Sequence, residues 1–132
     1  MKKLLVLMLT VVMILSFGII ASATEAENTI VTTETELLDA LANGGNITLG
    51  ADIQLTDGWT VDAEKEVVLD LAGNDLTVGK LTSNASIRGK LTVKDTVGGG
   101  VSTARNHFIY GELILESGIL QNISTNTAGF AV

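Results

Sequence analysis

Three aspartates, Asp70, Asp75 and Asp95, have the side chains and positions best suited to chemistry. Carboxylate oxygens are preferred ligands of hard cations, so these residues are candidate calcium ligands. Asp is also common in turns, where its side chain accepts local hydrogen bonds, and Asp75 and Asp95 occur at expected turns. The sequence therefore favours structural roles. No catalytic, cofactor-binding or metal-binding residue is assigned, and calcium is the only cofactor worth testing.

Other familiar chemistries have little support in this sequence. His107 is the only histidine and the chain has no cysteine, so a zinc site would lack its usual ligands. A serine nucleophile would need His107 as its base, and the chain has no Gly-x-Ser-x-Gly pattern. We therefore expect His107 to be a surface residue in a turn.

Glycine and aromatic residues offer two further candidate binding features. The glycines at 98–100 lack the following lysine and the strand-to-helix setting of a phosphate-binding loop, which favours a flexible corner. Trp59 and Tyr110 could stack on sugar rings. No shared strand face is predicted for them, however, and Trp59 is more typical of a residue that covers the edge of a core. Sugar stacking is therefore the weaker interpretation.

The first 23 residues predict export. Lys2 and Lys3 precede an apolar run from Leu4 to Ile20, and Ala21–Ala23 supplies the small-x-small pattern of a cleavage site. The run approaches the length of a membrane span, so a retained anchor is the alternative, with the remainder still outside the cytoplasm. We expect a secreted or cell-surface protein with a signal peptide at residues 1–23.

Charge narrows the range of partners. The chain has 8 basic and 15 acidic residues, and loss of Lys2 and Lys3 with the signal peptide leaves a formal charge of 6 − 15 = −9. Such a surface repels phosphates and anionic lipids, so we expect no nucleic-acid partner and no membrane contact except through an uncleaved signal segment. Neutral glycans and divalent cations remain compatible with this charge.

The elements that must position the candidate residues begin after a polar segment at 24–32, which we expect to be flexible. Thr33–Glu36 has the pattern of a capping box, and apolar residues follow at helical spacing. Asn43–Gly45 supplies a stop signal. These features predict a short amphipathic helix at about Glu34–Ala42.

A repeat of 20 to 25 residues fills the rest of the chain. Ile87–Asp95 aligns with Ile109–Ser117 at an offset of 22, Glu66–Asp70 with Lys90–Lys94 at 24, and Ile47–Leu49 with Val67–Leu69 at 20. A second series runs through Ile53, Leu76, Val101 and Ile123. Two parallel series of four strands predict an all-β parallel β-helix of about four coils in one domain, residues 33–132.

The repeat predicts which side chains point inward and which form charged columns. Leu69, Leu91, Val93, Leu113 and Leu115 are expected to face the core, with glycines at 73, 98–100 and 118 in the corners. Charges outside the core then fall into two columns that alternate in sign. The first contains Glu66, Lys90 and Glu112, and the second contains Asp70, Lys94 and Glu116.

Several segments resemble a known group of proteins. Glu36–Leu49 with Ala51–Ile53 resembles the opening of bacterial cell-surface and secreted right-handed parallel β-helix proteins of the pectate-lyase-like superfamily, in which a helix caps the first coil. Val68–Thr77 is similar to their early coils and Gly89–Val93 to their rung motif. The resemblance covers about Ile30–Val132 and implies a right-handed coil stack on or outside a bacterial cell.

The same resemblance implies a chemistry for the enzymes of the group. Their acidic residues on successive coils hold calcium, and an arginine on a strand acts as the base. Arg88 and Arg105 are the candidates here, although neither matches a motif of the group. Asp70 and Glu116 already have an expected role as ladder partners of Lys94.

The repeat continues to the last residue, because Phe130–Val132 falls where Phe108–Tyr110 falls one coil earlier. We therefore expect a truncated reading frame or the N-terminal part of a longer protein, with an open coil edge that can self-associate.

Two functions are compatible with these patterns. One is a non-catalytic exported module for adhesion or for binding a polysaccharide or host ligand. The alternative is the N-terminal fragment of a polysaccharide lyase or hydrolase whose active site lies on later coils.

Overall fold

The computed structural model describes residues 27–123, which are mostly β-structure with one short helix. In chain order the elements are β1 (Asn28–Val31), α2 (Glu34–Asn43), β2 (Gly45–Leu49), β3 (Ile53–Leu55), β4 (Trp59–Val61), β5 (Glu66–Asp70), β6 (Leu76–Val78), β7 (Ala85–Ile87), β8 (Lys90–Lys94), β9 (Val101–Ala104), β10 (His107–Ile109), β11 (Glu112–Leu115) and β12 (Ile119–Asn122). The expected signal peptide at 1–23 and the repeat match at Phe130 lie outside the described residues.

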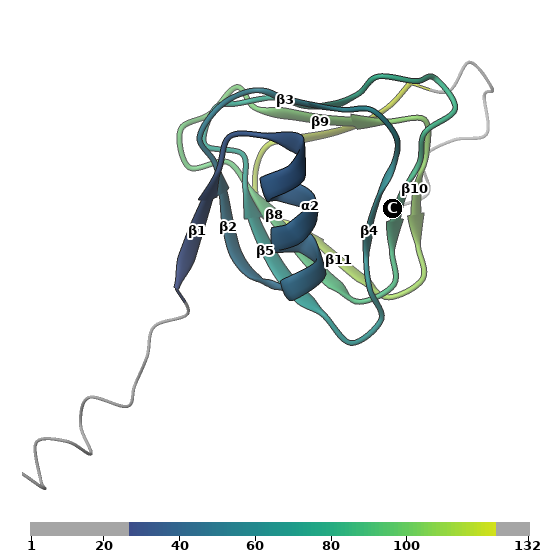
Figure 1. The fold of residues 1–132 in the computed structure, drawn as a ribbon, viewed down its shortest axis with the longest axis horizontal. Coiled ribbons are helices and arrows are strands. Elements are labelled where there is room, and N and C mark those ends of the chain that lie inside the picture. The colour runs from purple at the N-terminus through teal and green to yellow at the C-terminus, as the bar shows by residue number, and fades with distance from the viewer. Residues whose placement is uncertain (1–26, 124–132) are drawn as a thin grey trace, which may run out of the picture.

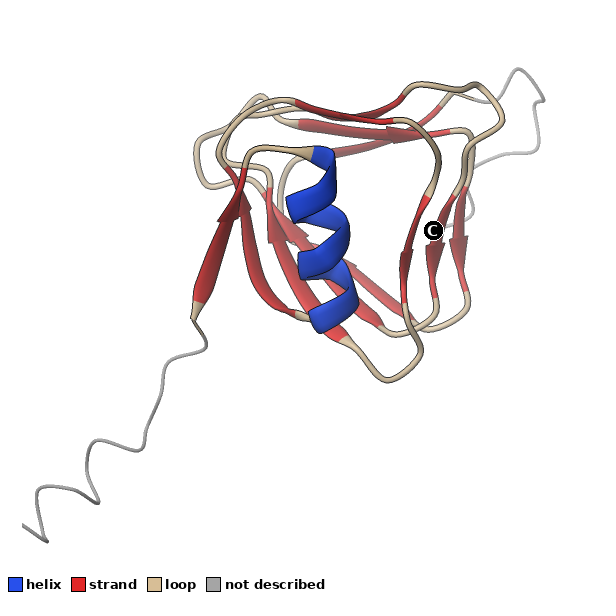
Figure 2. Cartoon of the chain, viewed as in Figure 1, coloured by secondary structure: helices blue, strands red, loops and turns tan. Residues whose placement is uncertain are grey.

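The strands form three parallel sheets rather than the two series expected from the repeat. The first sheet has the order β1-β2-β5-β8-β11, the second β3-β6-β9-β12 and the third β4-β7-β10. Figures 1 and 2 show the sheets on three sides of the molecule, with α2 across one end. The side chains between them form the apolar core. The series β4-β7-β10 was not predicted, because its strands follow those of the second sheet after short corners and the repeat does not separate the two.

The chain visits the three sheets in the same order on each round, which we call a circuit. Circuit 1 contains β2, β3 and β4, circuit 2 contains β5, β6 and β7, and circuit 3 contains β8, β9 and β10. Circuit 4 contains β11 and β12 within the described part of the chain. Each circuit pairs strand to strand with the next, so alternate residues face the shared interior.

The structure confirms the predicted register in the middle of the repeat. Lys90 pairs with both Glu66 and Glu112, and Ile53 pairs with Leu76. Within the first column, the Lys90 ammonium lies 3.1 Å from a Glu66 carboxylate oxygen. Hydrogen bonding to Glu66, with the charges of Glu66 and Glu112, raises the pKa of Lys90. This column therefore alternates in charge as predicted.

Two other predicted offsets are wrong. Ile47 pairs with Leu69 instead of Val67, a slip of two residues that keeps the same side chains inside. Val101 pairs with Ile119 instead of Ile123. The second error arises because the corner before β9 contains the glycines at 98–100, whereas the corner before β12 has no equivalent segment.

The structure also corrects the expectation that residues 24–32 form a flexible segment. Asn28–Val31 form β1, which adds to the first sheet in parallel with β2. Val31 is fully buried, and its carbonyl accepts a hydrogen bond from the Gly50 N–H at 2.8 Å. The polar character of the preceding residues concealed this strand, because only Val31 contributes to the core.

The predicted helix is confirmed with both ends in place. The Thr33 hydroxyl accepts the Glu36 N–H at 3.3 Å, and the Glu36 carboxylate accepts the Thr33 N–H at 3.2 Å, which is a complete capping box. Hydrogen bonding from the Thr32 N–H is the main cause that lowers the pKa of Glu36. Gly44 ends the helix at φ +80°, and Leu37 and Leu41 bury the inner face.

The interior is formed by the inward residues of successive circuits. Leu69, Leu91 and Val93 are fully buried, as predicted. Leu113 is half-buried and Leu115 is 47% exposed, because both belong to the last circuit that the structure describes. The core is therefore deepest beneath circuits 1 to 3 and opens toward circuit 4.

Among residues 27–123, no helix has the length and apolar character needed to cross a membrane.

Candidate functional site

The three candidate calcium ligands lie where the chain passes from the first sheet to the second. Asp70 ends β5 and is 6% exposed. Its Oδ1 accepts the N–H groups of Ala72 at 2.9 Å and Thr96 at 3.0 Å, and its Oδ2 accepts the Thr96 hydroxyl at 2.8 Å. Asp70 therefore joins circuits 2 and 3. Its predicted place as the ladder partner of Lys94 is confirmed by the register, although its carboxylate oxygens bind Ala72 and Thr96.

Asp95 has a more extensive set of amide donors. Its Oδ1 accepts the N–H groups of Gly73 at 2.7 Å and Gly98 at 3.0 Å, and its Oδ2 accepts that of Gly100 at 2.8 Å. Burial acts to raise the pKa of Asp95, but the backbone hydrogen bonds from Gly100, Gly98 and Gly73 outweigh it and lower the pKa. The glycine corner thus binds an anion, and that anion is the carboxylate of Asp95.

Asp75 continues this arrangement. Its Oδ1 accepts the Val101 N–H at 3.0 Å, and its own N–H donates to Asp52 Oδ1 at 2.8 Å. Each of the three candidate aspartates therefore uses carboxylate oxygens to bind backbone amides of a neighbouring turn or circuit. Amide hydrogens carry positive partial charge, so they compete with a cation for the same oxygen lone pairs. Within the described segment, no group of His, Asp and Glu residues is placed to hold a metal ion.

The two candidate arginine bases lie in different places. Arg88 follows β7 and is exposed, whereas Arg105 follows β9 and is half-buried. The Arg105 N–H donates to the Ser83 carbonyl at 2.8 Å, and the Arg88 N–H donates to the Val61 carbonyl at 2.9 Å. Neither arginine is among the residues that line the groove described below.

His107 is not the surface turn residue that the sequence suggested. It begins β10 and is half-buried, with its ring edge-on to Trp59 at a centroid distance of 6.3 Å. His107 Nδ1 lies 2.7 Å from Asn122 Oδ1, and burial lowers the pKa of the imidazole. Trp59 is 2% exposed, so the structure removes it from the candidates for sugar stacking.

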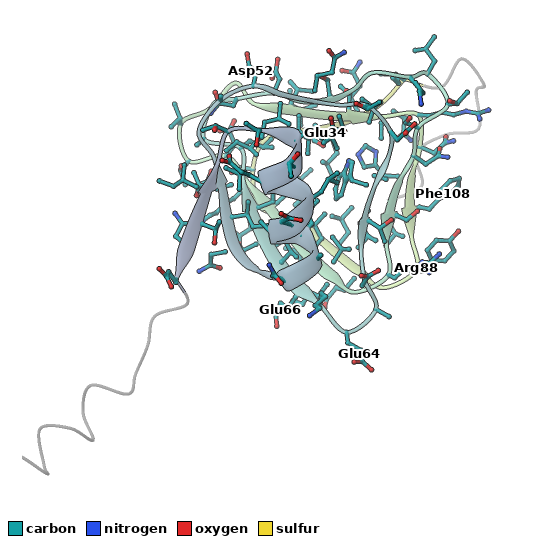
Figure 3. All side chains as sticks on the ribbon, in the orientation of Figure 1. Glu34, Asp52, Glu64, Glu66, Arg88 and Phe108 are labelled. Atoms are coloured by element: carbon teal, nitrogen blue, oxygen red, sulfur yellow. The ribbon has the colours of Figure 1, made fainter. Side chains whose placement is uncertain are left out.

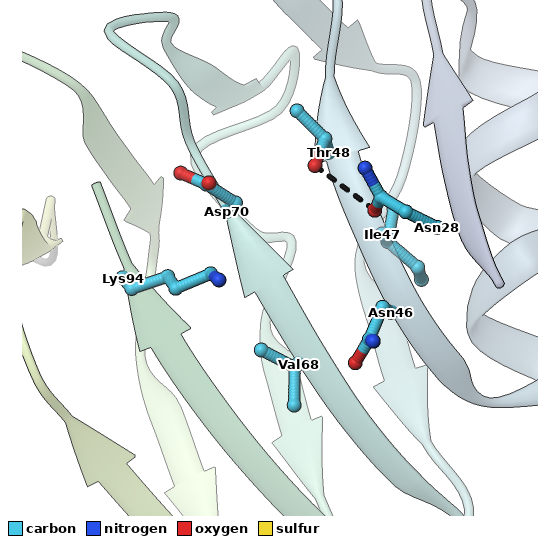
Figure 4. Close-up of a pocket in the computed structure, with 7 residues that line it drawn as sticks. All are labelled: Asn28, Asn46, Ile47, Thr48, Val68, Asp70 and Lys94. Atoms are coloured by element: carbon cyan, nitrogen blue, oxygen red, sulfur yellow. Dashed lines mark hydrogen bonds between the residues drawn. The ribbon is translucent and has the colours of Figure 1, made fainter. Parts of the chain in front are cut away.

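A polar groove lies on the outer face of the first sheet. It has a volume of about 560 Å³ and is lined by residues of β1, β2, β5 and β8 (Figure 4): Asn28, Asn46, Ile47, Thr48, Val68, Asp70 and Lys94. The Thr48 hydroxyl donates to Asn28 Oδ1 at 3.1 Å, which orders the β1 side of the groove. Amides, a hydroxyl, an ammonium and the apolar Val68 therefore face the same space.

Comparison of the chain with protein-family models, curated proteins and solved structures found no match. The groove must therefore be interpreted from its own geometry.

Sequence reasoning missed this groove for two reasons. Its β1 wall comes from a segment expected to be flexible, and Lys94 was interpreted only as a member of the charged column with Asp70 and Glu116. The available signal was the alternation of polar Asn46 and Thr48 with inward Ile47 and Leu49, since residues two apart on a strand share a face.

Proposed function

We propose that this chain is an exported, non-catalytic module of a bacterial cell-surface or secreted protein, and that it binds a polysaccharide or a host surface ligand. Its circuits are the coils of a right-handed parallel β-helix capped by α2. The predicted signal peptide at residues 1–23 supports the export part of the proposal.

The observation that carries the binding proposal is the groove on the first sheet. A saccharide has hydroxyl groups that both donate and accept hydrogen bonds, and apolar C–H surfaces between them. Asn28, Asn46 and Thr48 supply amide and hydroxyl groups, and Val68 supplies an apolar contact. Because these residues lie on paired strands of one sheet, their side chains are held in place before a ligand arrives.

Lys94 is the cation of this groove. Residues 27–123 contain ion pairs at Lys80–Asp57 and Lys90–Glu66, but none that involves Lys94. Asp70, its neighbour in the groove, directs its oxygens to Ala72 and Thr96. The Lys94 ammonium is therefore available to donate hydrogen bonds to ligand hydroxyl or carboxylate oxygens.

A polysaccharide array followed by titration calorimetry tests this proposal. The mature chain is expected to bind at least one glycan, and Lys94→Ala or Asn46→Ala should weaken that binding by roughly tenfold, because each removes a hydrogen-bonding side chain from the groove. Lys80→Ala is the matched control, since Lys80 lies in a corner of the second sheet and pairs with Asp57. The control should bind as the wild type does.

Two results would contradict the proposal. One is a wild-type affinity in both groove variants, which would place the ligand elsewhere. The other is calcium-dependent cleavage of oligogalacturonate by the purified chain, which would show a lyase in place of a binding module.

A further inference from the structure

Two exposed aromatic residues share the outer face of the third sheet. Phe108 is the register partner of Ser86, and Tyr110 follows Ile109, the partner of Ile87. Phe108 is 41% exposed and Tyr110 is 71% exposed. Their ring centroids are 6.4 Å apart and their planes differ by 33°, so the two rings form a broad apolar platform.

The platform is fixed by the sheet beneath it. The Tyr110 N–H donates to the Ile87 carbonyl at 2.8 Å, which continues the β7–β10 pairing beyond the end of β10. Residues two apart on a strand point to the same side, so Phe108 and Tyr110 are presented together without a folding step on binding. Ligand binding to this face therefore needs little ordering of the protein.

Charged residues of both signs lie next to the platform in sequence or in register. Arg88 follows Ile87 as Tyr110 follows its register partner Ile109, so the two residues come next in the same register. Figure 3 shows Arg88 and Phe108 on the same side of the molecule. Arg88 forms no ion pair with any described residue. Asp62 follows Val61, the partner of Ile87 on β4, and the exposed Glu112 begins the next strand. The guanidinium donates hydrogen bonds and the two carboxylates accept them. One cation and two anions leave a net charge of −1, which disfavours an anionic ligand.

We infer that Phe108 and Tyr110 form a binding site for a neutral saccharide, separate from the groove on the first sheet. The apolar C–H face of a sugar ring stacks on the aromatic platform. Its hydroxyl groups then accept hydrogen bonds from Arg88 and donate to Glu112. A ligand with one flat apolar face and a rim of neutral hydroxyl groups matches this surface.

This inference does not rest on the proposed groove, because the two sites lie on different sheets. A chain with both sites could hold a polysaccharide at two points, which raises the apparent affinity without new contacts. Variants at one site are therefore expected to leave the intrinsic affinity of the other unchanged.

Binding of cellohexaose, xylohexaose and mannohexaose to the mature chain tests the inference. Saturable binding of at least one of them is expected, with a change in Tyr110 absorbance. The double variant Phe108→Ala/Tyr110→Ala should weaken that binding by roughly tenfold or more, whereas Tyr110→Phe should retain most of it because the stacking ring remains. Lys80→Ala, which lies outside both proposed sites, should bind these oligosaccharides as the wild type does.

Circular dichroism must show the same folded signal in every variant. If the double variant unfolds, Phe108→Leu replaces it, because leucine keeps an apolar surface but has no ring. The inference is overturned if none of the three oligosaccharides binds at millimolar concentration, or if loss of both rings leaves the affinity unchanged. It is also overturned if Phe108→Leu binds as tightly as the wild type, since the surface would then recognise apolar groups in general.

Discussion

Replacement of Gly89 by alanine is expected to destabilise the fold by about 3 kcal/mol or more. Gly89 is buried between β7 and β8, and a Cβ atom there would overlap the carbonyl oxygens of Asp62 and Lys65. Both are backbone atoms, so neither can rotate away. The Lys65 carbonyl also accepts the Lys90 N–H at 2.9 Å, so a shift would disturb the start of β8.

Chemical denaturation followed by circular dichroism measures this loss. Gly50→Ala is the matched control, because the atoms nearest to a Cβ at Gly50 are the side-chain methyl groups of Ile30 and Thr32, each at 3.0 Å. The Val31 carbonyl oxygen lies at an ordinary contact distance of 3.5 Å. Ile30 and Thr32 are exposed and can adjust. Equal stability of the Gly89 and Gly50 variants would show that the corner at Gly89 does not approach the corner at residues 62–65 as closely as described.

Asp95→Asn is expected to produce the second large effect, a fall in Tm on the order of 5–10 °C. The carboxylate uses both oxygens to accept the amides of Gly73, Gly98 and Gly100. An asparagine has only one acceptor oxygen, and its NH₂ group would face an amide hydrogen. Asp57→Asn is the control, since Asp57 is exposed and pairs only with the exposed Lys80.

The pH dependence of this effect follows from the lowered pKa of Asp95. Its contribution to stability is complete above the ordinary Asp value of 3.8 and is lost as the pH falls through the lower folded-state pKa. The Tm difference between wild type and Asp95→Asn should therefore be constant near neutral pH and shrink in strong acid. A difference that grows as the pH falls below 3.8 would contradict the hydrogen-bonded role of this carboxylate.

The parts of the fold that follow local rules could be predicted from the sequence. The capping box of Thr33 and Glu36 defines a helix through contacts three residues apart. The alternation of inward and outward residues in β5, β8 and β11 predicts their register because a slip of one residue would bury charges. A slip of two residues keeps that alternation, which explains the error at Ile47.

Corner lengths and corner contacts could not be predicted in the same way. Asp70 is the strand partner of Lys94 as expected, but its carboxylate binds Thr96, because the next circuit supplies an amide and a hydroxyl there. The groove likewise depends on β1, which precedes α2 in the chain and pairs with β2, which follows it. The Phe108–Tyr110 platform had a local signal, two aromatic residues two positions apart, but the strand that carries Phe108 was not predicted.

Engineered disulfides test the stacked register most directly, because the native chain has no cysteine to interfere. Val68 and Thr92 are register partners in β5 and β8. Neighbouring strands lie about 4.8 Å apart, within the usual Cα separation of a disulfide. The double variant Val68→Cys/Thr92→Cys is therefore expected to cross-link under mild oxidation, as detected by peptide mass mapping. Val68→Cys/Lys90→Cys and Val68→Cys/Lys94→Cys should remain mostly reduced, and preferential cross-linking of either pair would contradict the register on which this account rests.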